Sequence, residues 1–218
     1  MAQSPEKEEL GDRDLAFFGA MTASLSHQLN NVFTIINEVN GLLEDLLLAS
    51  ERGGEMPPEK IKAIAGKMGK QVRRGVDYVK RLNRLAHMVD EPEVSLELGE
   101  WLGLADGLCR RFAILKRATL EIRAPAEPVT VSTNPFLLLQ AVFLCLDIVL
   151  QEAGENESLS LRIESGPSGS AVVLEAATPV PEMPVIESKL RLLETIMGRI
   201  GGRVSIDDER RSFGLWLG

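Results

Sequence analysis

The residues best suited to chemistry lie in one polar segment, Ser24 to Asn31, inside a long apolar-periodic stretch. A neutral imidazole such as that of His27 has one ring nitrogen free to act as a nucleophile, for example toward a phosphoryl group. His27 is two residues from both Leu25 and Leu29, so on a helix it projects away from the apolar side. Asn31 follows one turn later and would share the face of His27. The segment therefore predicts an exposed nucleophile with amide neighbours.

The apolar residues around this segment predict the element that positions it. Their spacings alternate between three and four, which is typical of a long helix that packs on other helices. With Thr22 at the one polar position, the seam consists of Leu15, Phe18, Leu25, Leu29, Val32, Ile36, Val39, Leu43 and Leu46. Residues 50–58 then carry glycines, which end helices, and prolines, which suit the first turn of a new one.

A second seam follows this turn and consists of Ile61, Ala65, Met68, Val72, Gly75, Val79, Leu82, Ala86 and Val89. Two long helices joined by a short loop predict an antiparallel hairpin. Such a hairpin has little to bury its seams against, and pairing two copies into a four-helix bundle would cover them. We therefore expect a homodimer.

The segment Glu91-Pro92-Glu93 breaks the second helix and divides the chain. Three regions are expected: a flexible or disordered N-terminus (1–13), the helical hairpin (14–90) and a second domain (91–218). In the second domain, predicted helices and strands alternate. The helices cover 96–117, 135–152 and 186–200, and the strands cover 119–122, 159–164, 171–176, 203–206 and 212–217. The sequence thus predicts an α+β fold, a hairpin followed by an α/β sandwich with one sheet face covered by helices.

Composition and charge exclude several classes of protein. The 218 residues are 44% hydrophobic and 26% charged, as in globular proteins, and the net charge of −8 argues against nucleic acid as a partner. The polar N-terminus does not resemble a signal peptide, and the apolar run 141–150 is too short to span a bilayer. We expect a cytoplasmic protein without a membrane partner. Cys109 and Cys145 make no metal motif, so no metal site is expected, and both thiols should be buried and reduced.

The order of a helical hairpin and a helix-covered sheet resembles the core of two-component sensor histidine kinases, where a dimerisation and phosphotransfer hairpin precedes an ATP-binding domain. The segment at His27 is similar to the H-box of that family, with Gln28 in place of the acidic residue and Asn31-Val32 in place of Asn-Pro or Thr-Pro. The resemblance implies that His27 is the phosphoacceptor and that Gln28 orients the ring. It also implies that Asn31 helps to position a water that dephosphorylates the partner.

The second domain carries the order of the kinase motifs without their chemistry. Residues 133–142 resemble the lead-in to the N-box, and residues 201–204 resemble the Gly-Gly turn after the penultimate helix. The two N-box asparagines that would hold Mg²⁺ are replaced by Leu144 and Ile148, which offer no oxygen to a hard cation. The adenine-binding Asp-x-Gly-x-Gly turn reads Thr-Pro-Val-Pro-Glu over 178–182, and the second glycine box reads Glu-Ser-Lys-Leu over 187–190. Since residues 184–186 also leave almost no room for an ATP lid, we expect no ATP binding and no cofactor.

These features resemble the kinase-derived histidine phosphotransferases of the ChpT family. The resemblance implies phosphate transfer from a receiver-domain aspartate of an upstream, hybrid-type histidine kinase to His27 and onward to another response regulator. The receiver would supply the Mg²⁺. Cations of the second helix, among them Arg73, Arg74, Lys80 and Arg81, could attract an acidic receiver. Two alternatives remain open at this point: a non-catalytic adaptor or pseudokinase, and an atypical histidine kinase or response-regulator phosphatase.

Overall fold

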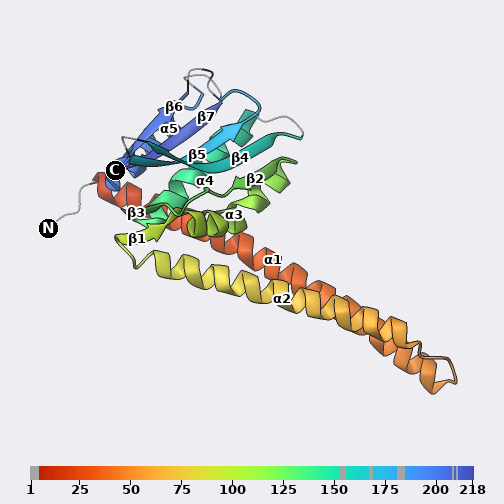
Figure 1. Cartoon of the computed structure of the whole chain (residues 1–218). Helices are drawn as coiled ribbons and strands as arrows, with labels where there is room; N and C mark the ends of the chain where they lie inside the picture. Colours follow the sequence, from red (N-terminus) through yellow and green to blue (C-terminus); the bar gives the residue numbers. More distant parts are fainter. Residues whose placement is uncertain (1–4, 153–155, 167–168, 181–184, 208, 210) are drawn as a thin grey trace. The chain divides into compact units, whose positions relative to one another are not determined.

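The protein consists of two compact units, Met1–Arg84 and Leu85–Gly218. In Figure 1 the first unit contains the two long helices coloured red to yellow, and the second contains the helices and strands coloured green to blue. The computed structural model describes residues 5–152, 156–166, 169–180, 185–207, 209 and 211–218.

The first unit is an antiparallel pair of helices, α1 (Pro5–Glu51) and α2 (Pro58–Met88). Two devices expected from the sequence end one helix and start the next. Gly53 has φ +85°, and the N–H of Gly54 donates to the carbonyl oxygen of Ala49 at 2.9 Å, which is the glycine-dependent end of a helix. Pro58 then occupies the first turn of α2, where a proline costs no hydrogen bond.

Helix α1 begins earlier than the sequence predicts. Residues 5–13 are helical, although a flexible N-terminus is expected for 1–13, and residues 1–4 lie outside the described part of the chain. The apolar seam does not extend as far back as the helix, because Leu15 is 69% exposed. The helix therefore continues for about two turns beyond the apolar pattern from which its start was predicted.

The predicted hairpin seam is confirmed at Leu25, Val32 and Val39 of α1, which are buried, and on α2 it is only partly correct. The predicted positions Met68 and Gly75 of α2 are half-buried. Elsewhere on α2 the buried residues are one position earlier than predicted, and they include Ile64, Gln71 and Tyr78. Val72 and Val79, which the sequence places in the seam, are 54% and 44% exposed. The shift arises because α2 has two neighbouring strips of suitable residues and α1 covers only one of them.

The second unit is built on a five-stranded sheet in the order β2-β4-β5-β7-β6. The strands are β2 (Thr119–Arg123), β4 (Ser158–Gly166), β5 (Gly169–Ala176), β6 (Arg203–Ile206) and β7 (Ser212–Leu217). Strand β2 runs parallel to β4, and the other pairs are antiparallel. One face is apolar because Leu161, Leu174 and Phe213 are aligned across three strands and are buried.

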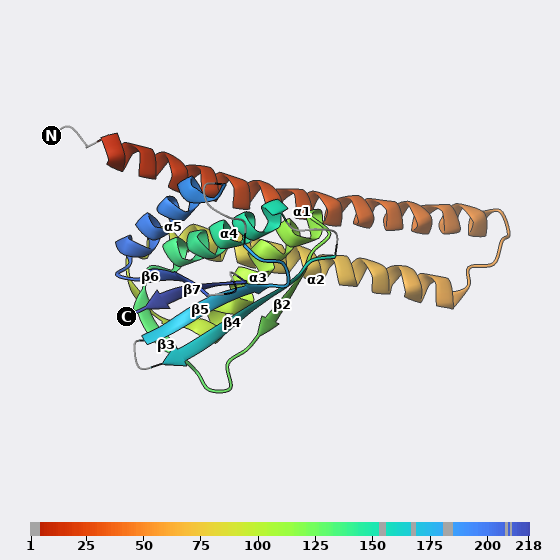
Figure 2. The same cartoon turned by 90° about the horizontal axis from the view of Figure 1, so that it is seen from above.

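Three helices cover that apolar face, as Figure 2 shows: α3 (Leu98–Leu115), α4 (Pro135–Glu152) and α5 (Glu187–Arg199). Helix α4 is apolar on nearly all sides, and Leu138, Leu139, Ala141, Cys145 and Ile148 are each 0% exposed. A helix of this kind is the centre of a core and not its cover. The predicted sandwich is therefore confirmed, with α4 as its central helix.

A small second sheet was not predicted. Strands β1 (Val94–Glu97) and β3 (Thr130–Thr133) pair antiparallel, so the helix expected over 96–117 begins only at Leu98. The carboxylate of Glu97 fixes this start, because it accepts from the backbone N–H groups of Glu100 at 2.6 Å and Gly99 at 2.9 Å. The same two hydrogen bonds hold the pKa of Glu97 below its ordinary value.

Candidate functional site

His27 lies near the middle of α1, where the helix is regular, and its side chain is exposed. At about 100° per residue it points away from α2, because the buried seam runs through Leu25 and Val32. Within the described part of the chain, no side chain forms a hydrogen bond to the imidazole. The ring is thus accessible to a partner molecule.

The two residues expected to assist His27, Gln28 and Asn31, both carry amide side chains and both lie on α1. The Nε2 of Gln28 donates to the carbonyl oxygen of Ser24 at 3.5 Å, so this amide faces the preceding turn and not the ring. Asn31 is exposed one turn after His27, on the same face of α1. The nearest acidic residues along α1 are Asp14 and Glu38, several turns away in either direction. No carboxylate of α1 therefore lies within three turns of His27.

The register of the hairpin shows which residues of α2 lie near which part of α1. A Cβ atom on Gly75 would be 3.4 Å from Cγ1 of Val32, so these two residues lie level. Since the helices are antiparallel, a step forward on α1 is matched by a step back on α2. Phe33 is therefore near the level of Arg74, and Leu29 near that of Tyr78.

One side of the hairpin is apolar and open to solvent. Counted around each helix from its buried seam, the exposed residues Phe33, Val72, Val76 and Val79 fall on the same side. They are 58%, 54%, 48% and 44% exposed, and the register brings them to neighbouring levels. We call these four residues the apolar side. Four large apolar residues exposed on one side of two neighbouring turns are more than the singly scattered aliphatic residues of an ordinary surface.

The opposite side of the hairpin is basic. Lys60, Lys67, Arg74 and Arg81 repeat every seven residues along α2 and form what we call the basic stripe. Arg74 is held in place by the Oε1 of Gln71 at 3.4 Å and the hydroxyl of Tyr78 at 3.3 Å, and the Arg81 guanidinium lies 5.8 Å from the centre of the Tyr78 ring.

Only part of the basic surface expected from the sequence lies on this stripe. Arg74 and Arg81 belong to it. Arg73 and Lys80 precede them by one residue and project about 100° further round α2, away from α1. Lys60 and Lys67 also belong to the cations of this helix, but they are not among the four named from the sequence. Their seven-residue spacing was the signal that could have identified them.

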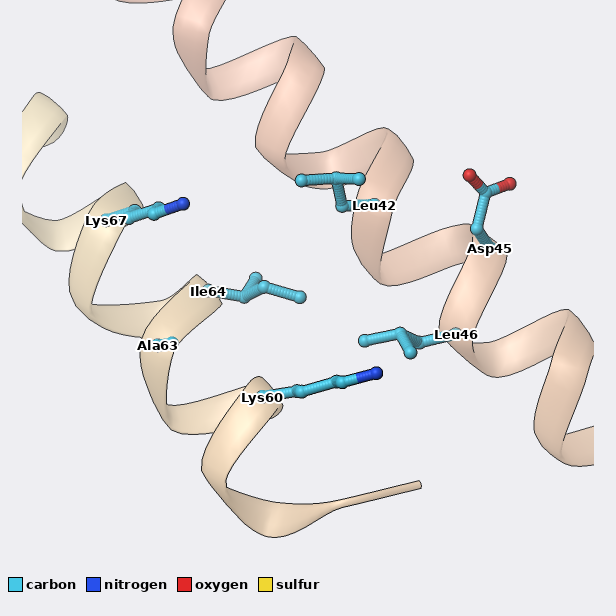
Figure 3. A pocket seen from close by; sticks show the side chains of 7 residues that line it. All are labelled: Leu42, Asp45, Leu46, Lys60, Ala63, Ile64 and Lys67. Carbon is cyan, nitrogen blue, oxygen red and sulfur yellow. The ribbon is translucent and has the colours of Figure 1, made fainter. Parts of the chain in front are cut away.

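A cleft of about 370 Å³ opens between the two helices in the half of the hairpin between His27 and the connecting turn. Figure 3 shows Leu42, Leu46 and Ile64 pointing into it from both helices, while Lys60 and Lys67 reach across from α2 toward α1. Asp45 and Ala63 complete the lining. The cleft therefore combines an apolar floor with a cationic edge, and two of its cations belong to the basic stripe.

In the second unit, Leu144 and Ile148 are the residues predicted to stand at the two N-box positions. Ile148 is 0% exposed and Leu144 is half-buried. Beside them, the Nζ of Lys189 on α5 lies 2.7 Å from a carboxylate oxygen of Asp147 and 3.0 Å from Oε1 of Gln151, both on α4. The lysine of the degenerate second glycine box thus joins two helices of the protein.

Thr178, the first residue of the predicted degenerate adenine-binding turn, is held by a buried carboxylate. Glu157 is 6% exposed and accepts from the backbone N–H of Thr178 at 2.9 Å and from its hydroxyl at 2.5 Å. Residues 181–184 of the predicted turn and lid lie outside the described part of the chain. Over the described residues, no group of three or more His, Cys, Asp or Glu side chains could hold a metal ion, and no helix is long and apolar enough to cross a bilayer.

No protein-family model matches the sequence, and no curated protein matches it either. Among solved structures, the chain is similar to the histidine kinase AdeS of Acinetobacter baumannii at 13% identity and a TM-score of 0.46, over 88% of this chain and 97% of that one. It is also similar to a bacterial phosphotransferase at 12% identity and a TM-score of 0.44, over 99% and 97% of the two chains. A third similar structure is histidine kinase ThkA in complex with the response regulator TrrA, at 16% identity and a TM-score of 0.48, covering 97% of this chain and 65% of that one.

Proposed function

We propose that this protein is a phosphorelay histidine phosphotransferase. His27 accepts phosphate from the aspartate of one receiver domain and passes it to the aspartate of another, without using ATP. The observation that carries the proposal is the contrast between an exposed, unencumbered His27 and the aliphatic side chains that occupy the metal-binding positions of the resembling kinases.

The chemistry requires little of the protein beyond an accessible imidazole. The unprotonated ring nitrogen attacks the phosphorus of an aspartyl phosphate, an N–P bond forms, and the electrons of the broken O–P bond return to the aspartate carboxylate. The proton on the other ring nitrogen is released to solvent, which the exposure of His27 permits. Transfer to a second receiver is the reverse reaction. The Mg²⁺ that stabilises the transferring phosphoryl group comes from the receiver.

The absence of an acidic residue directly after His27 supports transfer between proteins over attack on ATP. In the resembling kinases the acidic residue after the histidine serves as a base, and the amide of Gln28 cannot remove a proton. In transfer from an acyl phosphate, the leaving carboxylate is already a weak base and a good leaving group. Asn31 would contact the receiver or orient water beside the phosphoryl group.

A second copy of the chain is the proposed cover of the apolar side. Phe33, Val72, Val76 and Val79 expose four large apolar side chains on one side of a two-helix hairpin, which has no third layer of its own. Packing against the same side of another copy would give a four-helix bundle with a closed core.

The basic side of the hairpin is the proposed docking site for the receiver. Receiver domains are expected to present carboxylates, and the basic stripe places four cations in one row on a chain with net charge −8. The cleft adds the exposed Leu42 side chain and the partly buried Leu46, so a docked helix could bury apolar residues between carboxylates. This assignment leaves the apolar side free for the second copy.

Radiolabel transfer tests the proposal. Purified protein is mixed with Mg²⁺ and ATP alone, or with a panel of receiver domains carrying labelled aspartyl phosphate. Label should arrive only from a receiver, and the product should be stable to alkali and labile to acid, as a phosphohistidine is. The chain contains two histidines, which provides a matched pair of variants. His27→Ala should abolish labelling, whereas His87→Ala should leave it unchanged.

The other outcomes each identify a different protein. Label taken directly from ATP would make it a working kinase and refute the proposal. Receivers that bind tightly, leave His27 unlabelled and lose no phosphate would make it an adaptor. Receivers that lose phosphate to water, with His27→Ala still active and Asn31→Ala inactive, would make it a phosphatase.

A further inference from the structure

Tyr78, the single tyrosine of the chain, lies in the buried seam of the hairpin. It is 8% exposed and follows the buried Gln71 by seven residues, so its ring lies on the side of α2 that faces α1. An aliphatic side chain would cover the seam without adding a polar atom, whereas the hydroxyl of a buried tyrosine needs a hydrogen-bond partner. The tyrosine therefore brings a hydroxyl group to this position that packing alone does not require.

The hydroxyl of Tyr78 orients the guanidinium of Arg74. Its oxygen accepts a hydrogen bond from Nη2 of Arg74 at 3.3 Å, and Oε1 of Gln71 accepts one from Nη1 at 3.4 Å. The three residues are spaced by three and four along α2, so they lie on one side of the helix. Each hydrogen bond is long, but together they engage both Nη atoms and so set the direction of the planar group.

These contacts orient the positive charge of Arg74 without neutralising it. Both acceptors are uncharged, and in the described part of the chain no carboxylate pairs with this guanidinium, although the exposed Asp77 is only three residues further along α2. Arg110 of the second unit shows the ordinary alternative, an ion pair with Asp106 at 2.7 Å. Since a guanidinium has five N–H donors, several of those in Arg74 remain available.

An oriented guanidinium without a carboxylate partner is suited to bind an anion that another molecule supplies. Because its direction is already set, less conformational freedom is lost on binding than for a freely moving arginine. Its planar fork matches a carboxylate, which it can bind through two parallel hydrogen bonds. The ring of Tyr78 also lies 5.8 Å from the guanidinium of Arg81, the next arginine of the basic stripe. One buried side chain thus adjoins two cations of the proposed docking side.

We propose that Tyr78 is a positioning residue, which holds the Arg74 guanidinium ready for a carboxylate on the surface of the docked receiver domain. The inference rests on the function proposed above, in which the basic stripe binds the receiver. Tyr78 is buried and touches neither the receiver nor the phosphoryl group. It acts through Arg74, so it raises the affinity for the receiver, while the chemical step stays at His27.

A double-mutant cycle on the full-length chain tests this role. The half-saturating receiver concentration and the saturated transfer rate are measured for the wild type, Tyr78→Phe, Arg74→Ala and the double variant, with the receiver that exchanges label most efficiently. Arg74→Ala should raise the half-saturating concentration by about tenfold or more, and Tyr78→Phe by about three- to tenfold. The double variant should be no weaker than Arg74→Ala alone, and all saturated rates should agree within about twofold.

Two further variants separate the orientation of Arg74 from its charge and from the loss of a hydroxyl as such. Arg74→Lys keeps the charge without the fork, so Tyr78→Phe should have no further effect on it. Thr195→Val removes a hydroxyl of α5 that donates within its own helix, to the carbonyl oxygen of Arg191 at 2.8 Å, and should behave as wild type. Thermal unfolding shows that each variant is folded at the assay temperature. Without any receiver, nitrogen-15 relaxation should show a more mobile Arg74 side chain in Tyr78→Phe than in the wild type.

The outcomes distinguish the positioning role from the function on which it rests. Unchanged half-saturation in Tyr78→Phe, or an equal effect of Tyr78→Phe in the Arg74→Ala background, would overturn the positioning role and leave the phosphotransfer intact. A receiver that binds without labelling His27, and whose binding shows the same non-additive cycle, would overturn the phosphotransfer and support the positioning role. If no receiver binds, if Arg74 binds only inorganic phosphate, or if its side chain is equally mobile in Tyr78→Phe, the proposal is wrong.

Discussion

His27 is exposed on a regular helix with amides as neighbours, whereas Ile148, which the resemblance to histidine kinases predicts to stand at an N-box position, is completely buried. The hairpin presents polar side chains where a partner could reach them. In the second unit, residues at the predicted degenerate motifs are aliphatic or form intramolecular contacts, as with Lys189 on Asp147 and Glu157 on Thr178. The second unit thus uses these positions for its own packing, while the hairpin presents surfaces that its own packing does not explain.

Because Ile148 is completely buried, we expect that an asparagine at this position would destabilise the second unit. Ile148→Asn removes a fully buried aliphatic side chain and leaves an amide in the core, so it should lower the free energy of unfolding by about 3–5 kcal/mol. Denaturant unfolding followed by circular dichroism would measure the change. Asp147→Asn, one residue earlier and exposed, is the control and should change stability by less than about 1 kcal/mol. A stable Ile148→Asn variant that binds ATP would show that the nucleotide site is still open.

Charged substitutions on the apolar side of the hairpin should weaken the proposed dimer without unfolding the single chain. Val72→Glu with Val79→Glu places two carboxylates per copy on the side assigned to a second copy, and we expect the dimer dissociation constant to rise by about a hundredfold or more. Sedimentation equilibrium or light scattering measures this directly. The control is Arg73→Glu with Lys80→Glu, adjacent residues that point away from α1. Should the wild type be monomeric at micromolar concentration, a second copy is not the cover of this side.

The features of the fold that the sequence predicts correctly are those set by residues close together in the chain. The hairpin, its turn and the exposure of His27 follow from periodicity and from Gly53 and Pro58, all of which act within a few residues. At two places the seam of α2 was misplaced by one residue, because Gln71-Val72 and Tyr78-Val79 each offer two adjacent candidates and only the partner helix selects between them. Strands β1 and β3 were missed because each has only four residues and their pairing joins segments far apart in the chain.

In the candidate site too, the features within one helix could be predicted, and those that depend on both helices could not. His27 and Asn31 share a helix face, so their spacing was sufficient to place them together. The cleft depends on which residues of α2 lie level with Leu42 and Leu46. The residue pattern of a single helix does not determine how two helices are aligned along their length. For the same reason the spacing within α2 did not show that Arg74 and Arg81, but not Arg73 and Lys80, lie on the side of the cleft.

Charge reversal on the basic stripe should have a smaller and salt-dependent effect. Lys67→Glu with Arg74→Glu replaces two cations that lie on the side of the cleft, and we expect the second-order transfer rate constant to fall about 10- to 100-fold at low salt. The loss should shrink as ionic strength rises, because screening weakens the attraction in the wild type. Lys62→Glu makes half of the same charge change on α2 outside the stripe and serves as the control. A double variant that transfers at the wild-type rate at low salt would exclude the stripe from docking.

The smallest effect is expected in the labelling of the two cysteines, which measures whether solvent reaches the interior of the second unit. Cys145 lies on α4 between Leu144 and Ile148, so its accessibility reports whether the space at the degenerate N-box is open. Burial raises the pKa of the Cys109 thiol to about 12 and also raises that of Cys145, so at neutral pH very little of either is the reactive thiolate. A maleimide reagent should therefore label neither thiol in the folded protein over minutes, and both after unfolding in guanidinium. Adding Mg²⁺ and ATP should not alter the labelling rate. Rapid labelling of Cys145 in the native state, slowed by ATP, would mean that the second unit retains a nucleotide pocket and that the contrast with the hairpin is not a real one.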